Sequence, residues 1–381
     1  MWPGDEYAGL RAASHWYRRP SISSKGFVRR QTMSSSPRVL AVGTANPVNR
    51  YSQREIYDLS TRFVPSYRNP RIEQIFMASD IDYRHLSFDI ATFSPDETAD
   101  DLHERFEKHS VLLAKEAAEQ SLERSAVNRG DIDYIVAVSC TGYLCPGLSA
   151  LLIKELGLRT DIQRADLIGM GCAGAMPGLQ RAYEYVMAYP DRKALVVAVE
   201  ICSACYYVDD SIETVVGNAI CGDGAAAAIV GNHGAGMGPE IVRFETLLDT
   251  SLIHTVGFQF RNGKLRIVLS KDIRGIAGGL AKKVIDRILQ SANLRMEDIR
   301  HWIIHSGGRK VIDAIKNEVG LSENQLVHSR SVLRNFGNMS SPTVLFVLHE
   351  TVVHASPRKG DLGIMLAMGP GLAVEGGLVR W

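Results

Sequence analysis

The chain has 381 residues, of which 45% are hydrophobic and 22% are charged, and its formal net charge is +1. This composition is ordinary for a soluble globular protein, and the near-neutral balance gives no reason to expect nucleic acid or a membrane surface as a partner. No apolar run approaches the roughly 18 residues of a membrane span. At roughly 150 residues per domain, the length allows two domains or one large duplicated unit.

The N-terminal segment differs from the rest of the chain. Residues 1–32 are basic and lack an apolar period, and Asp5 and Glu6 argue against a targeting peptide. Met33 opens the stretch "MSSSPRVLAVGTANP", which is typical of a natural start followed by a strand. We therefore expect residues 1–36 to form a disordered extension.

Six cysteines fall in one stretch of the chain: Cys140, Cys145, Cys172, Cys202, Cys205 and Cys221. Without a secretion signal, we expect reduced thiols and a cytoplasmic location. The C-x-x-C at residues 202–205, with two thiols upstream, leaves a zinc-binding protein as one alternative. The pair continues the apolar strand "KALVVAVEIC" without the turn residues of a zinc knuckle. This pattern favours a cavity lined with small, soft side chains and no metal.

Strands and helices alternate along the chain, which predicts an α/β fold. The fold also contains an internal repeat. Residues 113–139 and 280–306 align without a gap, and each has an amphipathic helix, an Asp-Ile turn and an apolar strand. "KALVVAVEIC" (193–202) then aligns with "GDLGIMLAMG" (360–369). We therefore predict two halves, residues 37–235 and 236–381, related by a pseudo-twofold axis.

The same alignment places Cys172 opposite Asn338. Each follows a glycine and precedes a helix-like run, so the two helix N-termini can face each other across the axis. There the helix dipole and a nearby imidazolium favour a thiolate at Cys172. His305 ends the apolar strand of "WIIHSGGRK", at the sheet edge where functional side chains gather. The Asn338 amide could join His305 in binding an oxyanion.

Two enzyme classes use cysteine, histidine and asparagine in this chain order. One is the papain-type peptidase, whose histidine follows the cysteine by roughly 130–150 residues, as His305 follows Cys172. However, Cys172 lies in mid-chain without the C-G-[SA]-C-[WY] signature, and a papain-like fold does not explain the repeat. The other class is the decarboxylating condensing enzyme of the thiolase fold.

Five blocks carry a resemblance to a known family. They are "GMGCAGAMPGLQ", "CGDGAAAAIVG", "WIIHSGGRKVIDAI", "VLRNFGNMSSPTVLF" and "AMGPGLAVE". In this order they resemble chalcone synthase-type, type III polyketide synthases over residues 37–381. The resemblance implies a thiolase fold of two αβαβα halves, a homodimer, and neither cofactor nor carrier protein. It also implies that Cys172 carries the starter or growing chain, while His305 and Asn338 hold malonyl-CoA during decarboxylation. Iterative condensation and cyclisation follow.

The family pattern also implies the pocket residues. They are Cys140, Thr141, Cys202, Ala204, Cys205, Cys221, Ile267 and Ser340. Cys221 stands where plant enzymes have a phenylalanine, so we expect a wider or differently angled opening. Cys145 replaces a methionine that plant enzymes extend into the neighbouring subunit.

The plant-type basic contacts to CoA are not evident in "NPRIEQIFMASDIDYRHL", and Arg309 and Lys310, with Gly308, are the predicted substitutes. Other blocks, such as "CTGYLCPGLSALLIKELG", resemble a bacterial branch that makes 3,5-dihydroxyphenylacetyl-CoA from malonyl-CoA as starter and extender. A long-chain alkylresorcinol or alkylpyrone synthase, using another acyl-CoA starter, is the alternative.

Overall fold

The structure is a computed structural model that describes residues 36–233, 238–270 and 272–381. Except for residue 36, the predicted extension lies outside the described residues. In the described part of the chain, every helix is too short or too polar to cross a membrane.

A sheet of nine strands forms the framework, in the order β11-β12-β13-β8-β1-β7-β6-β4-β5. The first half of the chain supplies β1 (Arg38–Ala45), β4 (Ile132–Ser139), β5 (Gln163–Ile168), β6 (Lys193–Glu200) and β7 (Gly224–Gly231). The second half supplies β8 (Glu240–Leu248), β11 (Ile299–Ile304), β12 (Leu362–Gly369) and β13 (Ala373–Arg380). The two sets meet where β1 pairs with β8 at Arg38 and Glu240.

The pairing pattern repeats between the halves. β4 is parallel to β6, β6 is antiparallel to β7, and β7 is antiparallel to β1. β11, β12, β13 and β8 follow the same sequence of one parallel and two antiparallel pairings. β5 is an additional edge strand, parallel to β4. This repeat confirms the predicted α/β fold of two related halves.

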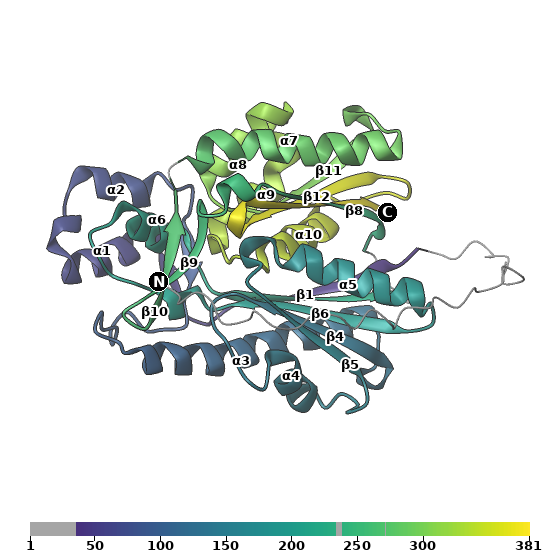
Figure 1. Cartoon of the computed structure of the whole chain (residues 1–381), viewed down its shortest axis with the longest axis horizontal. Coiled ribbons are helices and arrows are strands. Elements are labelled where there is room, and N and C mark those ends of the chain that lie inside the picture. Colours follow the sequence, from purple (N-terminus) through teal and green to yellow (C-terminus); the bar gives the residue numbers. More distant parts are fainter. Residues whose placement is uncertain (1–35, 234–237, 271) are drawn as a thin grey trace, which may run out of the picture. The chain divides into compact units, whose positions relative to one another are not determined.

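Helices form three layers around the two strand sets (Figure 1). α3 (Ala99–Ser125) and α4 (Leu148–Leu156) cover the outer face of the first set, and α7 (Ile273–Ala292) and α8 (Arg309–Val319) that of the second. α5 (Ala175–Ala188) and α10 (Thr343–His354) lie between the sets. The central strands are therefore covered on both faces, which explains their nearly continuous apolar sequence, such as "GAAAAIVG" in β7.

Smaller elements gather at one end of the sheet (Figure 1). They are α1 (Gln53–Phe63), α2 (Pro70–Met77), α6 (Ile212–Ile220), β9 (Val256–Arg261) and β10 (Lys264–Leu269). β2 (Arg50–Ser52) pairs with β3 (Tyr83–His85), and α9 (Val327–Phe336) contacts both β3 and α10. Short 3-10 turns complete the chain: η1 (Pro65–Tyr67), η2 (Arg129–Asp131), η3 (Gly171–Ala173), η4 (Cys202–Cys205), η5 (Thr250–Leu252), η6 (Met296–Asp298), η7 (Glu323–Leu326) and η8 (Pro370–Leu372).

Candidate active site

Cys172 lies in the turn η3, between β5 and the central helix α5. Gly171 has a φ of +52°, and a Cβ there would lie 2.3 Å from Cδ of Pro370. A Cβ on Gly369 would in turn lie 2.6 Å from the Met170 carbonyl oxygen. Two glycines therefore let the Cys172 turn of the first half pack closely against a loop of the second half.

Asn338 occupies the equivalent turn before α10. It follows Gly337, whose φ is +70° and whose Cβ would lie 2.7 Å from the Ile220 carbonyl oxygen. The Asn338 N–H donates to that oxygen at 2.8 Å, and the Asn338 carbonyl accepts from the Gly222 N–H at 3.0 Å. Cys172 and Asn338 therefore share the left-handed glycine and following central helix that the repeat predicts.

The structure brings Cys172, His305 and Asn338 to one cavity of about 410 Å³. The Asn338 amide lies 4.0 Å from the Cys172 sulfur. Its Nδ2 donates to the Gly307 carbonyl at 3.4 Å, while its Oδ1 accepts from the Ser340 N–H at 2.8 Å, so the amide orientation is fixed. His305 follows β11, and its ring is 4% exposed.

Burial disfavours charge on both members of the expected thiolate–imidazolium pair. It raises the pKa of the Cys172 thiol to about 12, against the hydrogen bonds with Ser340 and Asn338. It also lowers the pKa of His305 to about 4. The mutual attraction of a thiolate and an imidazolium acts in the opposite direction, so this pair stays a prediction.

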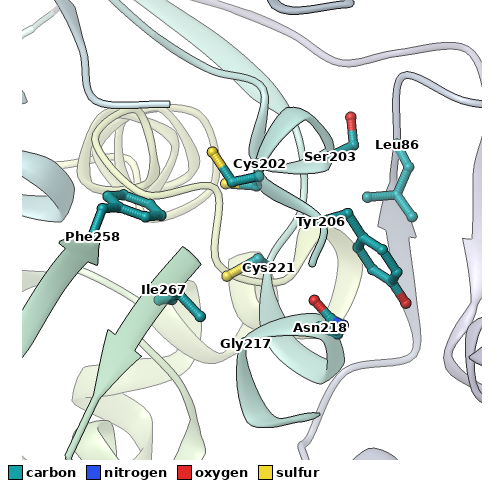
Figure 2. A pocket seen from close by; sticks show the side chains of 10 residues that line it. Leu86, Cys202, Ser203, Tyr206, Gly217, Asn218, Cys221, Phe258 and Ile267 are labelled. Carbon is teal, nitrogen blue, oxygen red and sulfur yellow. The ribbon is translucent and has the colours of Figure 1, made fainter. Parts of the chain in front are cut away.

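A second, much smaller cavity lies behind Cys221, and we call it the inner lobe (Figure 2). Its volume of about 30 Å³ has room for one or two water molecules. Figure 2 shows the Phe258 ring and Ile267 on one side, the Tyr206 ring on the other, and two thiols between them. The full lining is Leu86, Cys202, Ser203, Cys205, Tyr206, Gly217, Asn218, Cys221, Phe258 and Ile267.

Comparison with known families decides the relationship. Residues 24–234 match the N-terminal domain of chalcone and stilbene synthases, and residues 244–381 match the C-terminal domain. The chain belongs to this family, the type III polyketide synthases. It is therefore a condensing acyltransferase, and the family uses malonyl-CoA and acyl-CoA starters without a carrier protein.

Individual relatives agree with the family match. A 3,5-dihydroxyphenylacetyl-CoA synthase of Streptomyces toyocaensis is 34% identical over 91% of this chain and 90% of its own length. An alpha-pyrone synthesis polyketide synthase-like protein of Mycobacterium tuberculosis is 33% identical over 88% of each chain. The crystal structure of PKS-I from the brown alga Ectocarpus siliculosus superposes with a TM-score of 0.86 at 30% identity, covering 92% of this chain and all of that one.

In this polyketide synthase, Cys202, Cys205, Cys221 and Ile267 line the inner lobe as predicted. The lobe beside Cys221 holds only about 30 Å³, and the opening that is wider or differently angled than in plant enzymes stays a prediction. Phe258 is the cross-strand partner of Ile267 in the hairpin β9–β10, so both side chains face the same side. Sequence reasoning missed Phe258, although the Asn-Gly at residues 262–263 between two apolar runs predicts such a hairpin.

Three other predicted pocket residues gather around the buried carboxylate of Glu200. Its Oε2 accepts from the Cys140 N–H at 2.9 Å and from the Thr141 hydroxyl at 2.9 Å. The Cys140 sulfur lies 3.6 Å from the Ser340 hydroxyl, and Ser341 donates to Glu200 Oε1 at 2.5 Å. The carboxylate therefore joins the end of β4 to the Asn338 turn, a role that sequence reasoning did not assign.

Four predicted pocket residues line neither cavity: Cys140, Thr141, Ala204 and Ser340. Ala204 is 5% exposed and packs in the apolar core between α3 and the sheet. Of the C-x-x-C pair, the Cys205 sulfur lies 3.4 Å from the Thr141 carbonyl oxygen. Among the residues that the structure describes, no three His, Cys, Asp or Glu side chains gather as a metal site.

The mouth of the larger cavity is cationic. Arg309, Lys310 and Gly308 line it as predicted, but Arg71 of α2 and Arg274 of α7 line it too. Arg71 belongs to the segment in which sequence reasoning found no evident basic contact to CoA, and its place in the lining makes it a further candidate. Within residues 36–233, 238–270 and 272–381, Arg309 approaches Asp80 at 3.9 Å, whereas Arg71, Arg274 and Lys310 have no carboxylate partner.

Proposed function

We propose that this enzyme condenses malonyl-CoA onto a short starter held on Cys172 and cyclises the chain to a small aromatic or pyrone product. The small volume of the inner lobe is the observation that carries this proposal, because a long alkyl chain has no space beyond Cys221. 3,5-Dihydroxyphenylacetyl-CoA, the product named for the Streptomyces relative, is our candidate. Malonyl-CoA would then serve as both starter and extender.

Loading begins with a neutral thiol. As the Cys172 sulfur attacks the starter thioester, the neutral imidazole of His305 can accept the thiol proton and return it to the departing CoA thiolate. The sulfur–carbonyl bond forms as the carbonyl–CoA bond breaks. The depressed pKa of His305 leaves the ring unprotonated at neutral pH but also makes it a weak base, so we propose that proton transfer is concerted with attack of the sulfur on the carbonyl carbon.

Extension then uses the same cavity without a cofactor. His305 and Asn338 donate to the thioester oxygen of malonyl-CoA, and the bond to the carboxylate breaks with release of carbon dioxide. The bonding electrons become the enolate held by these two donors. The enolate carbon attacks the acyl carbonyl on Cys172, so a carbon–carbon bond forms and the sulfur leaves for the next cycle.

CoA binding has a matching electrostatic basis. Arg71, Arg274 and Lys310 come from three different helices and line the mouth without carboxylate partners among the described residues. Burial lowers the pKa of Lys310, and the positive charges of Arg274 and Arg309 lower it further. We infer that these cations hold the CoA phosphates, with Gly308 at the start of α8 allowing close approach, while Asp80 partly neutralises Arg309.

The assembly that we propose is a homodimer in the cytoplasm. β5 ends the sheet and, within the described residues, pairs only with β4, so its other edge can receive a partner. Ile168 on this strand is 53% exposed, and the neighbouring Tyr143 is 63% exposed. Cys145 is exposed beside them, and all six thiols are free, as a reducing compartment favours.

Within each protomer, we propose that the first half ends at residue 235 and the second half begins at residue 236.

Product analysis tests the proposal. The purified enzyme is incubated with malonyl-CoA alone and then with acyl-CoA starters of increasing length, and products are identified by mass spectrometry. We expect a product from malonyl-CoA alone and a steep fall in rate as the starter lengthens. Efficient use of long acyl-CoAs, with no product from malonyl-CoA alone, would instead establish the alkylresorcinol or alkylpyrone synthase.

A further inference from the structure

A completely buried arginine lies beside the site without touching the cavity. Arg84, in β3, is 0% exposed. Its Nη1 donates to the carbonyl oxygens of Asn218 at 2.6 Å and Cys221 at 2.7 Å, and its Nε donates to Gln53 Oε1 at 3.0 Å. No carboxylate pairs with it among the described residues, and Nη2 has no hydrogen-bond partner there. Burying a guanidinium in this way is costly, which calls for a reason.

The acceptors of Arg84 mark the C-terminus of α6. The last carbonyls of a helix lack intrahelical partners, and the negative end of the dipole lies there. Gln53 Nε2 adds a bond of 2.6 Å to the Ala219 carbonyl. Arg84 and Gln53 together therefore fix the end of α6 and the segment after it.

That segment is the platform on which Asn338 rests. The Asn338 N–H binds the Ile220 carbonyl and its own carbonyl binds the Gly222 N–H, so Cys221 and Asn338 form a β-bridge. The aliphatic part of Arg84 also packs directly under Gly337, where an added Cβ would lie 3.0 Å from Arg84 Cγ and Cδ. Arg84 thus contacts both sides of the bridge that holds the Asn338 turn.

We propose that Arg84 is a positioning residue that holds Asn338 in the geometry needed for enolate binding. The proposal rests on the role given to Asn338 under the proposed function. A residue that acts only through Asn338 must lose its influence once the Asn338 amide is removed, which separates positioning from general support of the fold.

Arg84→Met keeps the aliphatic stem and removes every donated hydrogen bond. We expect the kcat for malonyl-CoA decarboxylation to fall about tenfold to hundredfold, up to the loss caused by removing one oxyanion donor, with an unchanged KM. Arg84→Lys should recover part of the rate because it keeps the charge and one donor. The double variant Arg84→Met/Asn338→Ala should be within twofold of Asn338→Ala alone.

Arg266→Met is the matched control. Arg266 is also buried, at 8% exposed, but it binds Asp209 at 3.1 Å near the opposite end of α6. This control should lower the melting temperature while changing kcat less than twofold. If Arg84→Met does not fold, Gln53→Leu is measured in the same way, since it removes the second clamp on α6.

The proposal is overturned if the Arg84 variant, or Gln53→Leu in its place, decarboxylates at the native rate while Asn338→Ala is impaired. It is also overturned if the losses of Arg84→Met and Asn338→Ala multiply in the double variant. Native decarboxylation by Asn338→Ala itself would refute the assignment of Asn338 under the proposed function, and the positioning role with it.

Discussion

The two cavities of this synthase differ in nearly every physical respect, although Cys221 and the Asn338 turn stand between them. The larger one holds about 410 Å³, opens between cationic side chains, and contains Cys172, His305 and Asn338. The inner lobe holds about 30 Å³ and is lined by thiols and aromatic rings. The first carries groups suited to any CoA thioester. The second has no charged lining residue. Under the proposed function it would select starters mainly by size, so different residues would serve starter choice and bond chemistry.

Replacing Cys172, the proposed nucleophile in the larger cavity, should have the largest effect on the enzyme. Cys172→Ala should abolish acyl-enzyme formation from a labelled acyl-CoA, measured by intact-protein mass spectrometry, because no other thiol lies in the larger cavity. Cys205→Ala, in the wall of the inner lobe, is the control and should still be labelled. Label that persists in Cys172→Ala and maps to Cys202 or Cys221 would give the inner lobe a chemical role.

Removing either proposed enolate donor should have the next largest effect. His305→Ala and Asn338→Ala should each lower carbon dioxide release from malonyl-CoA by about a hundredfold or more, the usual loss for an oxyanion donor. Release of labelled carbon dioxide provides the measurement. A peptidase would ignore malonyl-CoA, and undiminished release in both variants would remove these residues from the decarboxylation step.

The mouth of the larger cavity should affect binding more than chemistry. Arg274→Ala and Lys310→Ala should each raise the KM for malonyl-CoA about tenfold with little change in kcat, since phosphate contacts are made equally in substrate and transition state. Added salt should narrow the difference from the native enzyme. Arg309→Ala is the internal comparison, and its effect should be smaller because Asp80 lies 3.9 Å from Arg309. If the three variants have the same KM for malonyl-CoA as the native enzyme, the proposed binding of the CoA phosphates by these cations is contradicted.

Enlarging the inner lobe should allow the enzyme to use longer acyl-CoA starters. Phe258→Ala should raise the relative kcat/KM for longer acyl-CoA starters several-fold, within the about 1–3 kcal/mol that hydrophobic pockets usually discriminate. Phe260→Ala is the control, because Phe260 lies two residues along the same strand and is 79% exposed. Cys221→Phe should act in the opposite direction by overfilling the lobe. Unchanged starter preferences in both lobe variants would show that the lobe does not select.

The smallest expected effect concerns pH. His305 takes up a proton near pH 6.5 when unfolded but only near pH 4 when folded. Its contribution to stability is therefore constant above pH 6.5 and becomes unfavourable as the pH falls toward 4, by about 2 kcal/mol at pH 4.5. His305→Gln should lose less unfolding free energy between pH 7 and pH 4.5 than the native enzyme, measured by urea titration. His349, whose pKa is also about 4, is present in both proteins and cancels. If both proteins lose the same unfolding free energy between pH 7 and pH 4.5, His305 must be accessible to water in the folded enzyme.

Sequence reasoning reached Cys172 and Asn338 through their alignment in the repeat, His305 through its place at the end of an apolar strand, and the thiolase fold through the family resemblance. The repeat is visible because both turns need a glycine of positive φ before a buried helix. A local requirement of this kind fixes the residue type at one position and can be recognised in the sequence. The burial of Cys172 is less visible in the sequence. The helix terminus is local, but the groups around the thiol include Glu200, Cys221 and Ser340, which come from separate parts of the chain.

For the inner lobe, too, the sequence predicted some properties and missed others. Its sulfur lining followed from the family pattern, but its volume depends on Phe258 and Tyr206, which reach it from separate elements. Arg84 was invisible in the sequence, because only tertiary structure shows which carbonyls a buried guanidinium serves. The volume of a cavity is set by contacts among several elements. The sequence pattern of a single element therefore says little about it.

The interlocked glycines at Gly171 and Gly369 have a consequence for how the enzyme matures. The turn that holds Cys172 packs against Pro370, nearly two hundred residues later in the chain. During synthesis the first half emerges before this partner exists, so Cys172 then has neither its opposing wall nor His305 and Asn338. The proposed site can therefore form only after residue 370 has been made.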